Sequence, residues 1–98
     1  MRILVVENDT ALAGFLKKGL EAEHYAVDVA PDGEEARCSV GESDYDLMVL
    51  DLNLPKMEGW EALRAVRLKK PSLPVLVATG GSRIKDRVQA LDAGAHDC

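Results

Sequence analysis

Hydrophobic and polar residues follow two different patterns along the chain. Short continuous apolar runs rich in Val, Ile and Leu are typical of strands buried on both faces of a sheet. Longer segments with apolar residues three and four positions apart are typical of amphipathic helices. The runs predict strands over residues 3–6, 25–30, 47–50 and 74–78, and the helical spacing predicts helices over residues 11–23, 34–40, 60–70 and 84–93.

Strands and helices alternate four times, with short connections between them. This order predicts an α/β fold in which helices cover both faces of a doubly wound parallel sheet. The last predicted helix ends near Gly94, close to residue 98, and in such an alternation a fifth strand is expected next. We therefore expect the chain to be a single domain, cut before its fifth strand and helix, from a longer gene product.

The first predicted helix shows the helical spacing clearly. The spacing predicts an inner face made of Leu12, Phe15, Leu16 and Leu20. Asp9 or Thr10 precedes the helix, and either side chain can accept hydrogen bonds from its first backbone N–H groups.

Polar side chains follow three of the four predicted strands. Glu7, Asn8 and Asp9 follow the first strand, Asp51 follows the third and Thr79 follows the fourth. In an open α/β sheet, functional groups gather at the carboxyl ends of the strands. Oxygen ligands around a carboxylate suit Mg²⁺, and an Asp beside such an ion can act as a nucleophile toward phosphorus. Thr79 can then donate its hydroxyl to a phosphoryl oxygen.

Each of these residues also has a purely structural interpretation. Taken singly, Asp51 is typical of a turn or helix cap, and Thr79 is typical of a local hydrogen bond. Glu7 and Asp9 can simply sit near the positive end of the following helix. Convergence of three strand ends on one sheet edge favours a cation or phosphate site, but on the residues alone both interpretations stay open.

Charge and cysteine content narrow the function classes further. The net charge of -5 argues against a nucleic-acid surface in this segment and fits a cation site or a basic partner, although acidic domains are common. Cys38 and Cys98 have neither the spacing of metal ligands nor that of a disulfide framework. A reducing cytoplasm is the simplest setting for a chain with two such cysteines. No apolar run reaches the roughly 20 residues of a membrane-spanning helix, so we expect no membrane partner.

Four segments, in order, resemble the receiver domain of bacterial two-component response regulators. They are "RILVVEND" for the first strand and its acidic cluster, "DYDLMVLDLNLPKMEGWEALRAVR" for the phospho-acceptor strand, loop and next helix, "LPVLVATGG" for the strand ending in a hydroxyl residue, and "DRVQALDAGAHDC" for the fourth helix and following turn. The resemblance covers the whole chain. It implies a flavodoxin-like (CheY-like) doubly wound parallel sheet with strand order 2-1-3-4-5.

The resemblance implies a role for each matching residue. Asp51 is the implied acceptor of a phosphoryl group from a sensor histidine kinase, and Thr79 is the hydroxyl that closes on that group. Mg²⁺ is the implied cofactor, held by Glu7, Asn8, Asp51 and the backbone carbonyl of Asn53. The implied function is a phosphorylation-controlled switch rather than an enzyme.

The chain departs from the family pattern at two positions. Asn8 stands where the family usually has an Asp that ligates the metal; an amide oxygen can coordinate but carries no charge, so metal affinity is expected to fall. Cys98 stands where the family has an aromatic residue on the fifth strand, which weakens the usual coupled movement with the hydroxyl residue. The family's Lys would come after residue 98.

The fourth-helix sequence Asp86-Arg87-Val88 and the segment "LDAGAHD" resemble the OmpR/PhoB-like subfamily. That subfamily implies homodimerisation through the fourth-helix face on activation. It also implies transcription regulation through a winged-helix DNA-binding output domain beyond the chain. The structural alternative is a solvated charged face in which Arg87 pairs with a nearby acid.

Two other functions stay open on the sequence. Asn8 motivates a phosphorylation-independent pseudo-receiver, which would act as an interaction module. The second is an Asp-nucleophile phosphatase, which resembles this site but needs a second Asp two residues after the nucleophile. Asn53 occupies that place and argues against a phosphatase.

Overall fold

The computed structural model describes residues 1–51 and 58–78, which hold four strands and three helices. Every described element was predicted, with ends within two residues of the expected ones, and the predicted helix over residues 84–93 lies outside the described residues. No helix in the described ranges is long and apolar enough to cross a membrane. The elements are β1 (Arg2–Val6), α1 (Thr10–Ala22), β2 (Ala26–Ala30), α2 (Gly33–Glu42), β3 (Leu47–Asp51), α3 (Glu58–Lys69) and β4 (Val75–Ala78).

The four strands form one parallel sheet in the order β2-β1-β3-β4. This order confirms the predicted parallel topology and agrees with the first four strands of the 2-1-3-4-5 order. Because all strands run in the same direction, their carboxyl ends lie along one edge of the sheet. β1 pairs with β2 from Arg2↔Ala26 to Val6↔Ala30 and with β3 from Ile3↔Leu47 to Val6↔Leu50, and β3 pairs with β4 from Met48↔Val75 to Asp51↔Ala78.

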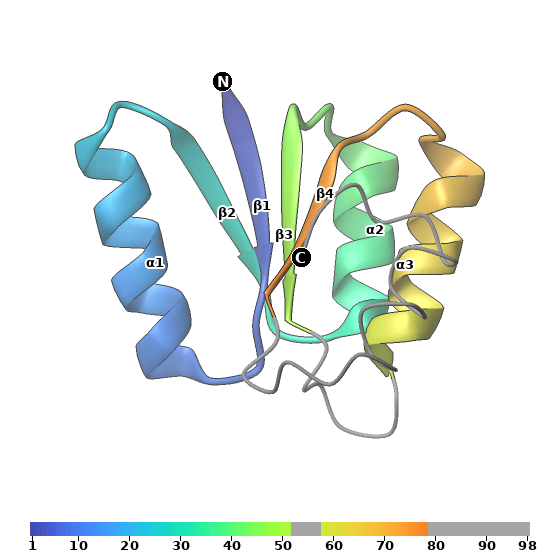
Figure 1. Cartoon of the computed structure of the whole chain (residues 1–98), viewed down its shortest axis with the longest axis horizontal. Coiled ribbons are helices and arrows are strands. Elements are labelled where there is room, and N and C mark those ends of the chain that lie inside the picture. Colours follow the sequence, from blue (N-terminus) through green and yellow to red (C-terminus); the bar gives the residue numbers. More distant parts are fainter. Residues whose placement is uncertain (52–57, 79–98) are drawn as a thin grey trace.

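Helices cover both faces of the sheet, as the alternation of elements predicts. Figure 1 shows α1 on one side and α2 and α3 together on the other. Successive strand residues point to opposite faces, so Leu4 and Val6 join the core under α2 and α3, while Ile3 and Val5 join the core under α1. All four side chains are at most 2% exposed, which is why this strand reads as a continuous apolar run.

Helix α1 begins and ends at residues with recognisable cap geometry. The Oδ1 atom of Asp9 accepts hydrogen bonds from the backbone N–H groups of Ala11 (3.0 Å) and Leu12 (3.1 Å), so Asp9 rather than Thr10 is the cap. At the other end His24 has a φ of 70°, and its N–H donates to the carbonyl oxygen of Glu21 (2.9 Å). This left-handed residue turns the chain from α1 toward β2.

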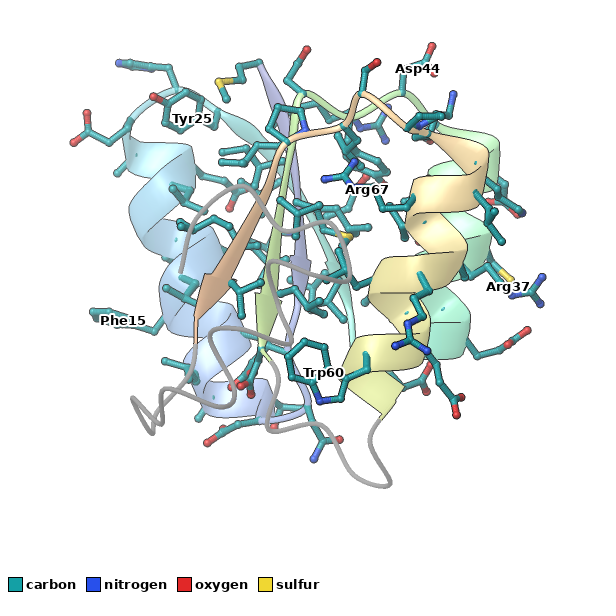
Figure 2. All side chains as sticks on the ribbon, turned by 45° about the vertical axis from the view of Figure 1, so that its right-hand side comes forward. Phe15, Tyr25, Arg37, Asp44, Trp60 and Arg67 are labelled. Carbon is teal, nitrogen blue, oxygen red and sulfur yellow. The ribbon has the colours of Figure 1, made fainter. Side chains whose placement is uncertain are left out.

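The predicted inner face of α1 is wrong for two of its four residues. Leu16 and Leu20 pack against the sheet, but Leu12 is 44% exposed and Phe15 is 74% exposed. Each residue of a helix is rotated by about 100° from the one before it, so Phe15 lies well outside the stripe centred on Leu16 and Leu20. Figure 2 shows Phe15 projecting away from the sheet. We name Leu12 and Phe15 the α1 patch.

The amino-terminal edge of the sheet is held together around Arg2. Its backbone N–H donates to Oδ2 of Asp46 (2.7 Å), and its Nη2 donates to Oδ2 of Asp28 (2.8 Å). The hydroxyl of Tyr45 donates to the same Asp28 oxygen (2.7 Å), and the Arg2 guanidinium lies 5.3 Å from the centroid of the Tyr45 ring. This network ties β1 to β2 and to the residues that precede β3.

Candidate functional site

Glu7 and Asp51 lie at the carboxyl edge of the sheet on neighbouring strands. Val6 pairs with Leu50 in parallel register, and Glu7 and Asp51 are the next residue on each chain segment. The backbone N–H of Glu7 donates to the carbonyl oxygen of Ala30 (3.0 Å), which extends the β1–β2 ladder by one residue. Strand pairing on both sides therefore places the two carboxyl groups next to each other.

Glu7 is a buried carboxyl group, with only 4% of its surface exposed. Its Oε2 atom has no hydrogen-bond partner among the described residues. Burial, a hydrogen bond to Asp51, and repulsion by the charges of Asp51 and Asp9 raise the pKa of Glu7 to about 8, against a smaller opposing effect of a hydrogen bond from the Asn8 backbone. In the absence of a cation, Glu7 therefore carries a proton at neutral pH.

The three polar residues after β1 have different surroundings. Asp9 caps α1 through its carboxylate, which confirms the structural interpretation for this residue. Asn8 is exposed, whereas Glu7 is turned into the protein beside Asp51. A position near a helix terminus does not account for Glu7, because no cap donor reaches its buried Oε2 in the described residues.

Three residues to which the family resemblance gives a place at the site lie outside the described residues. They are Asn53, Thr79 and Cys98. Thr79 is the residue that follows Ala78, and Ala78 is the strand partner of Asp51. The structure therefore brings together Glu7 and Asp51 of the predicted site, with Asn8 directly after Glu7.

The donor atoms at this edge are oxygens. Among the described residues, no group of three or more His, Cys, Asp or Glu side chains is arranged to hold a metal ion. What the described edge offers is two carboxyl groups, from Glu7 and Asp51, and the amide of Asn8. Oxygen donors of this kind suit a hard cation such as Mg²⁺, and a buried carboxyl oxygen without a partner is the kind of atom that a cation satisfies. The residues present therefore fit a divalent cation.

Two features beside this edge add to the site. Trp60 is partly buried on α3, packs against the core, and lies toward the carboxyl ends of the strands in Figure 2. The α1 patch starts in the first turn of α1, directly after Asp9. This patch was not predicted, because helical spacing alone placed both residues on the inner face; the 100° rotation between successive helical residues separates Phe15 from Leu16.

A hollow of about 300 Å³ lies between the amino-terminal parts of α2 and α3. Its lining residues are Gly33, Glu34, Arg37, Glu61, Ala62 and Ala65. Arg37 and Glu34 pair with each other. Neither Glu7 nor Asp51 is among these lining residues.

Comparison with known proteins identifies the family of the chain. Residues 3–98 match the model of the response regulator receiver domain family. The chain is 41% identical over 97 residues to the cell cycle response regulator CtrA of Brucella ovis, an alignment that covers 99% of this chain and 42% of the relative. The chain thus spans about two fifths of the length of the curated relatives it matches.

Solved structures agree with this match. A response regulator protein from Burkholderia pseudomallei with a phosphorylated aspartic acid, calcium ion and citrate has a TM-score of 0.92 and 31% identity, covering 98% of this chain and 56% of that one. The response regulator protein TrrA from Thermotoga maritima in complex with Mg(2+)-BeF has a TM-score of 0.87 and 32% identity, covering 98% of this chain and 82% of that one.

Proposed function

We propose, since the chain belongs to the family of response regulator receiver domains, that Asp51 accepts a phosphoryl group from a sensor histidine kinase. A receiver domain is a signalling domain and not an enzyme, which removes the phosphatase alternative. The observation that carries the assignment of Asp51 is its place beside Glu7, a buried carboxyl group with an unpartnered oxygen at the carboxyl edge of the sheet.

In the transfer a carboxylate oxygen of Asp51 acts as the nucleophile. That oxygen forms a bond to phosphorus while the bond between phosphorus and the leaving atom of the donor breaks, and the leaving group takes the electron pair. Glu7, Asn8, Asp51 and the backbone carbonyl of Asn53 are the residues that would hold Mg²⁺, which neutralises the phosphoryl oxygens when bound. Thr79 would donate its hydroxyl to one of these oxygens, so that the modified and unmodified states differ at this residue.

The α1 patch supports a protein as the phosphoryl donor. Leu12 and Phe15 lie in the first two turns of α1, at the end of the helix that adjoins Glu7. Exposed apolar side chains beside a reactive group favour contact with a partner surface, and a helical partner can bury such side chains against its own apolar face. A kinase domain that docks on this patch would bring its phosphoryl group to the same sheet edge.

We further propose that residues 1–98 form one cytoplasmic receiver domain that controls transcription through a winged-helix DNA-binding domain beyond the chain. Homodimerisation on activation would use the fourth-helix face. The support is the resemblance of Asp86-Arg87-Val88 and "LDAGAHD" to the OmpR/PhoB-like subfamily, together with the greater length of the Brucella relatives.

The assignment of Asp51 is tested by mapping the modified residue. The protein is treated with acetyl phosphate and Mg²⁺, and borohydride then reduces the acyl phosphate to an alcohol with release of phosphate. Mass spectrometry locates the residue that carries this alcohol. We expect a single acyl phosphate on Asp51 and none in the Asp51→Asn variant. Labelling of another residue, or undiminished labelling of Asp51→Asn, would show that the acceptor is elsewhere.

A second candidate function is a pseudo-receiver that binds its partner without phosphorylation. Asn8 favours this alternative, because an uncharged ligand weakens the cation site that phosphorylation needs. In that case neither Mg²⁺ binding nor labelling by acetyl phosphate would be detected in the protein, while substitutions in the α1 patch would still weaken partner binding.

A further inference from the structure

The outer surface of α2 and α3 has a hollow near one end and an exposed apolar side chain near the other. The two helices lie side by side on one face of the sheet and both begin at its carboxyl edge (Figure 1). The hollow of about 300 Å³ lies near the beginnings of both helices. Leu68 lies in the last turn of α3 and is 86% exposed, more than any other large hydrophobic residue among those described.

The hollow combines small residues with charged ones. The small residues are Gly33, Ala62 and Ala65. Because they carry at most a methyl group, they leave room for an apolar side chain that enters from outside. The charged residues are Glu34, Arg37 and Glu61, and Arg37 pairs with Glu34. Two carboxylates and one guanidinium leave the hollow with one net negative charge, so it should attract a side chain that has cations around it.

Leu68 has such cations around it. Arg64 lies one helical turn before Leu68 on the same face of α3, and Lys69 follows Leu68 directly. All three side chains are exposed. Glu61 is also exposed and lies seven residues before Leu68, which again places it on the same face. The exposed face of α3 therefore runs from an acid beside the hollow to bases beside Leu68.

We propose that this surface binds a second copy of the chain, with the two α3 helices antiparallel. Leu68 and the hollow lie toward opposite ends of the same pair of helices, so an antiparallel arrangement lets Leu68 of each copy enter the hollow of the other. Lys69 of each copy then faces Glu61 of the other. The contact is isologous, because every pair of residues that meets in it meets twice.

The contact is small, and we expect a weak dimer with a dissociation constant on the order of 100 µM. It forms without a phosphoryl group and does not use the fourth-helix face, so it is separate from the proposed dimerisation on activation. The inference thus goes beyond the proposed function. At the low micromolar concentrations used for urea unfolding, the protein is a monomer.

Sedimentation equilibrium of the whole protein measures the dissociation constant, with chelator and reductant present and no phosphoryl donor. Glu61→Lys and Lys69→Glu each bring like charges together at both contacts of the dimer. Each variant alone should therefore associate at least tenfold more weakly than the parent. An equal mixture of the two variants has opposite charges at both contacts, and it should associate about as tightly as the parent.

Leu68→Ala tests the apolar part of the contact and should also weaken association at least tenfold. Two control substitutions lie on α1, which covers the other face of the sheet. Phe15→Ala removes an exposed apolar side chain, and Lys18→Glu reverses an exposed charge. Both controls should leave the dissociation constant of the parent unchanged.

Three results would overturn the inference. The first is a parent protein that stays monomeric at about 1 mM. The second is an equal weakening of association by the control substitutions on α1. The third is a mixture of Glu61→Lys and Lys69→Glu that associates no better than either variant alone. Labelling of Asp51 by acetyl phosphate does not depend on association, so each of these results leaves the proposed function intact.

Discussion

Glu7 should make the stability of the cation-free protein fall as pH rises. Its pKa is about 8 in the folded protein and has an ordinary value of 4.5. Between these values the folded state keeps a proton that the unfolded state has released. The stabilising effect of that proton is complete below about pH 4.5 and is lost as pH rises through about 8. Each pH unit in this window lowers the free energy of unfolding by about 1.4 kcal/mol.

Replacing Glu7 with Gln removes this dependence. The Gln amide has nearly the same shape as a protonated Glu and can donate a hydrogen bond to Asp51 in the same way, but it does not ionise. At pH 7 the free energy of unfolding of the parent is lower than at pH 4.5 by about 3 kcal/mol because of Glu7. In a solution with chelator, Glu7→Gln should therefore be about 3 kcal/mol more stable than the parent at pH 7, and nearly as stable as the parent at pH 4.5.

Urea unfolding at several pH values between 5 and 8 measures the effect, with chelator present throughout. Glu61→Gln is the matched control, because it removes one carboxylate from an exposed position on α3. The control should follow the pH dependence of the parent. If the free energy of unfolding depends on pH in the same way in Glu7→Gln and in the parent, Glu7 does not hold a proton at neutral pH. The raised pKa of Glu7 would then be wrong.

Three further predictions concern other parts of the fold. Phe15→Ala should slow phosphoryl transfer from the cognate kinase at least tenfold without changing the rate with acetyl phosphate, as expected for an exposed docking residue. An equal decrease of the transfer rate with both donors would contradict a docking role for Phe15. Tyr45→Phe should cost about 1 kcal/mol in urea unfolding near neutral pH. Hydrogen bonds from Tyr45 and Arg2 lower the pKa of Asp28 below its ordinary value of 3.8. The loss of stability in Tyr45→Phe should therefore persist above pH 3.8 and disappear as pH falls through the lowered pKa of Asp28. A loss that does not depend on pH would contradict the hydrogen bond between Tyr45 and the Asp28 carboxylate. His24→Gly should raise the free energy of unfolding by about 1 kcal/mol, because Gly adopts a positive φ without strain. An unchanged midpoint of urea unfolding would mean that the backbone at His24 is not strained.

The fold was predictable because its signals are repeated and local. Each strand of the sheet is buried on at least one face, and the central strand β1 is buried on both, so apolar runs mark the strands whatever their neighbours are. Turn and cap residues indicate the ends of the helices independently. Asp32, for example, caps α2, because its Oδ1 atom accepts a hydrogen bond from the backbone N–H of Glu35 (2.9 Å). Alternation of strands and helices then leaves few topologies other than a parallel sheet.

The local surroundings of the site residues were not predictable in the same way. In sequence, Glu7, Asn8 and Asp9 are three similar polar residues after a strand. Their separate roles depend on small geometric differences: Glu7 continues the ladder with β2 and is buried, whereas Asn8 and Asp9 are exposed and Asp9 accepts the first N–H groups of α1. The exposure of Phe15 is of the same kind, because it depends on how α1 is rotated over the sheet rather than on hydrophobicity.

Register connects the predictable part of the fold to the site. The pairing of Val6 with Leu50 is what sets Glu7 beside Asp51. A shift of β1 by a single residue would reverse the faces of its side chains, and Leu4 and Val6 would have to exchange places with Ile3 and Val5 in the two cores. The cores on both sides of β1 therefore hold the two carboxyl groups together against their mutual repulsion. Packing under the helices stabilises a pair of acids that would otherwise separate, and the pair can then share a proton or bind a cation.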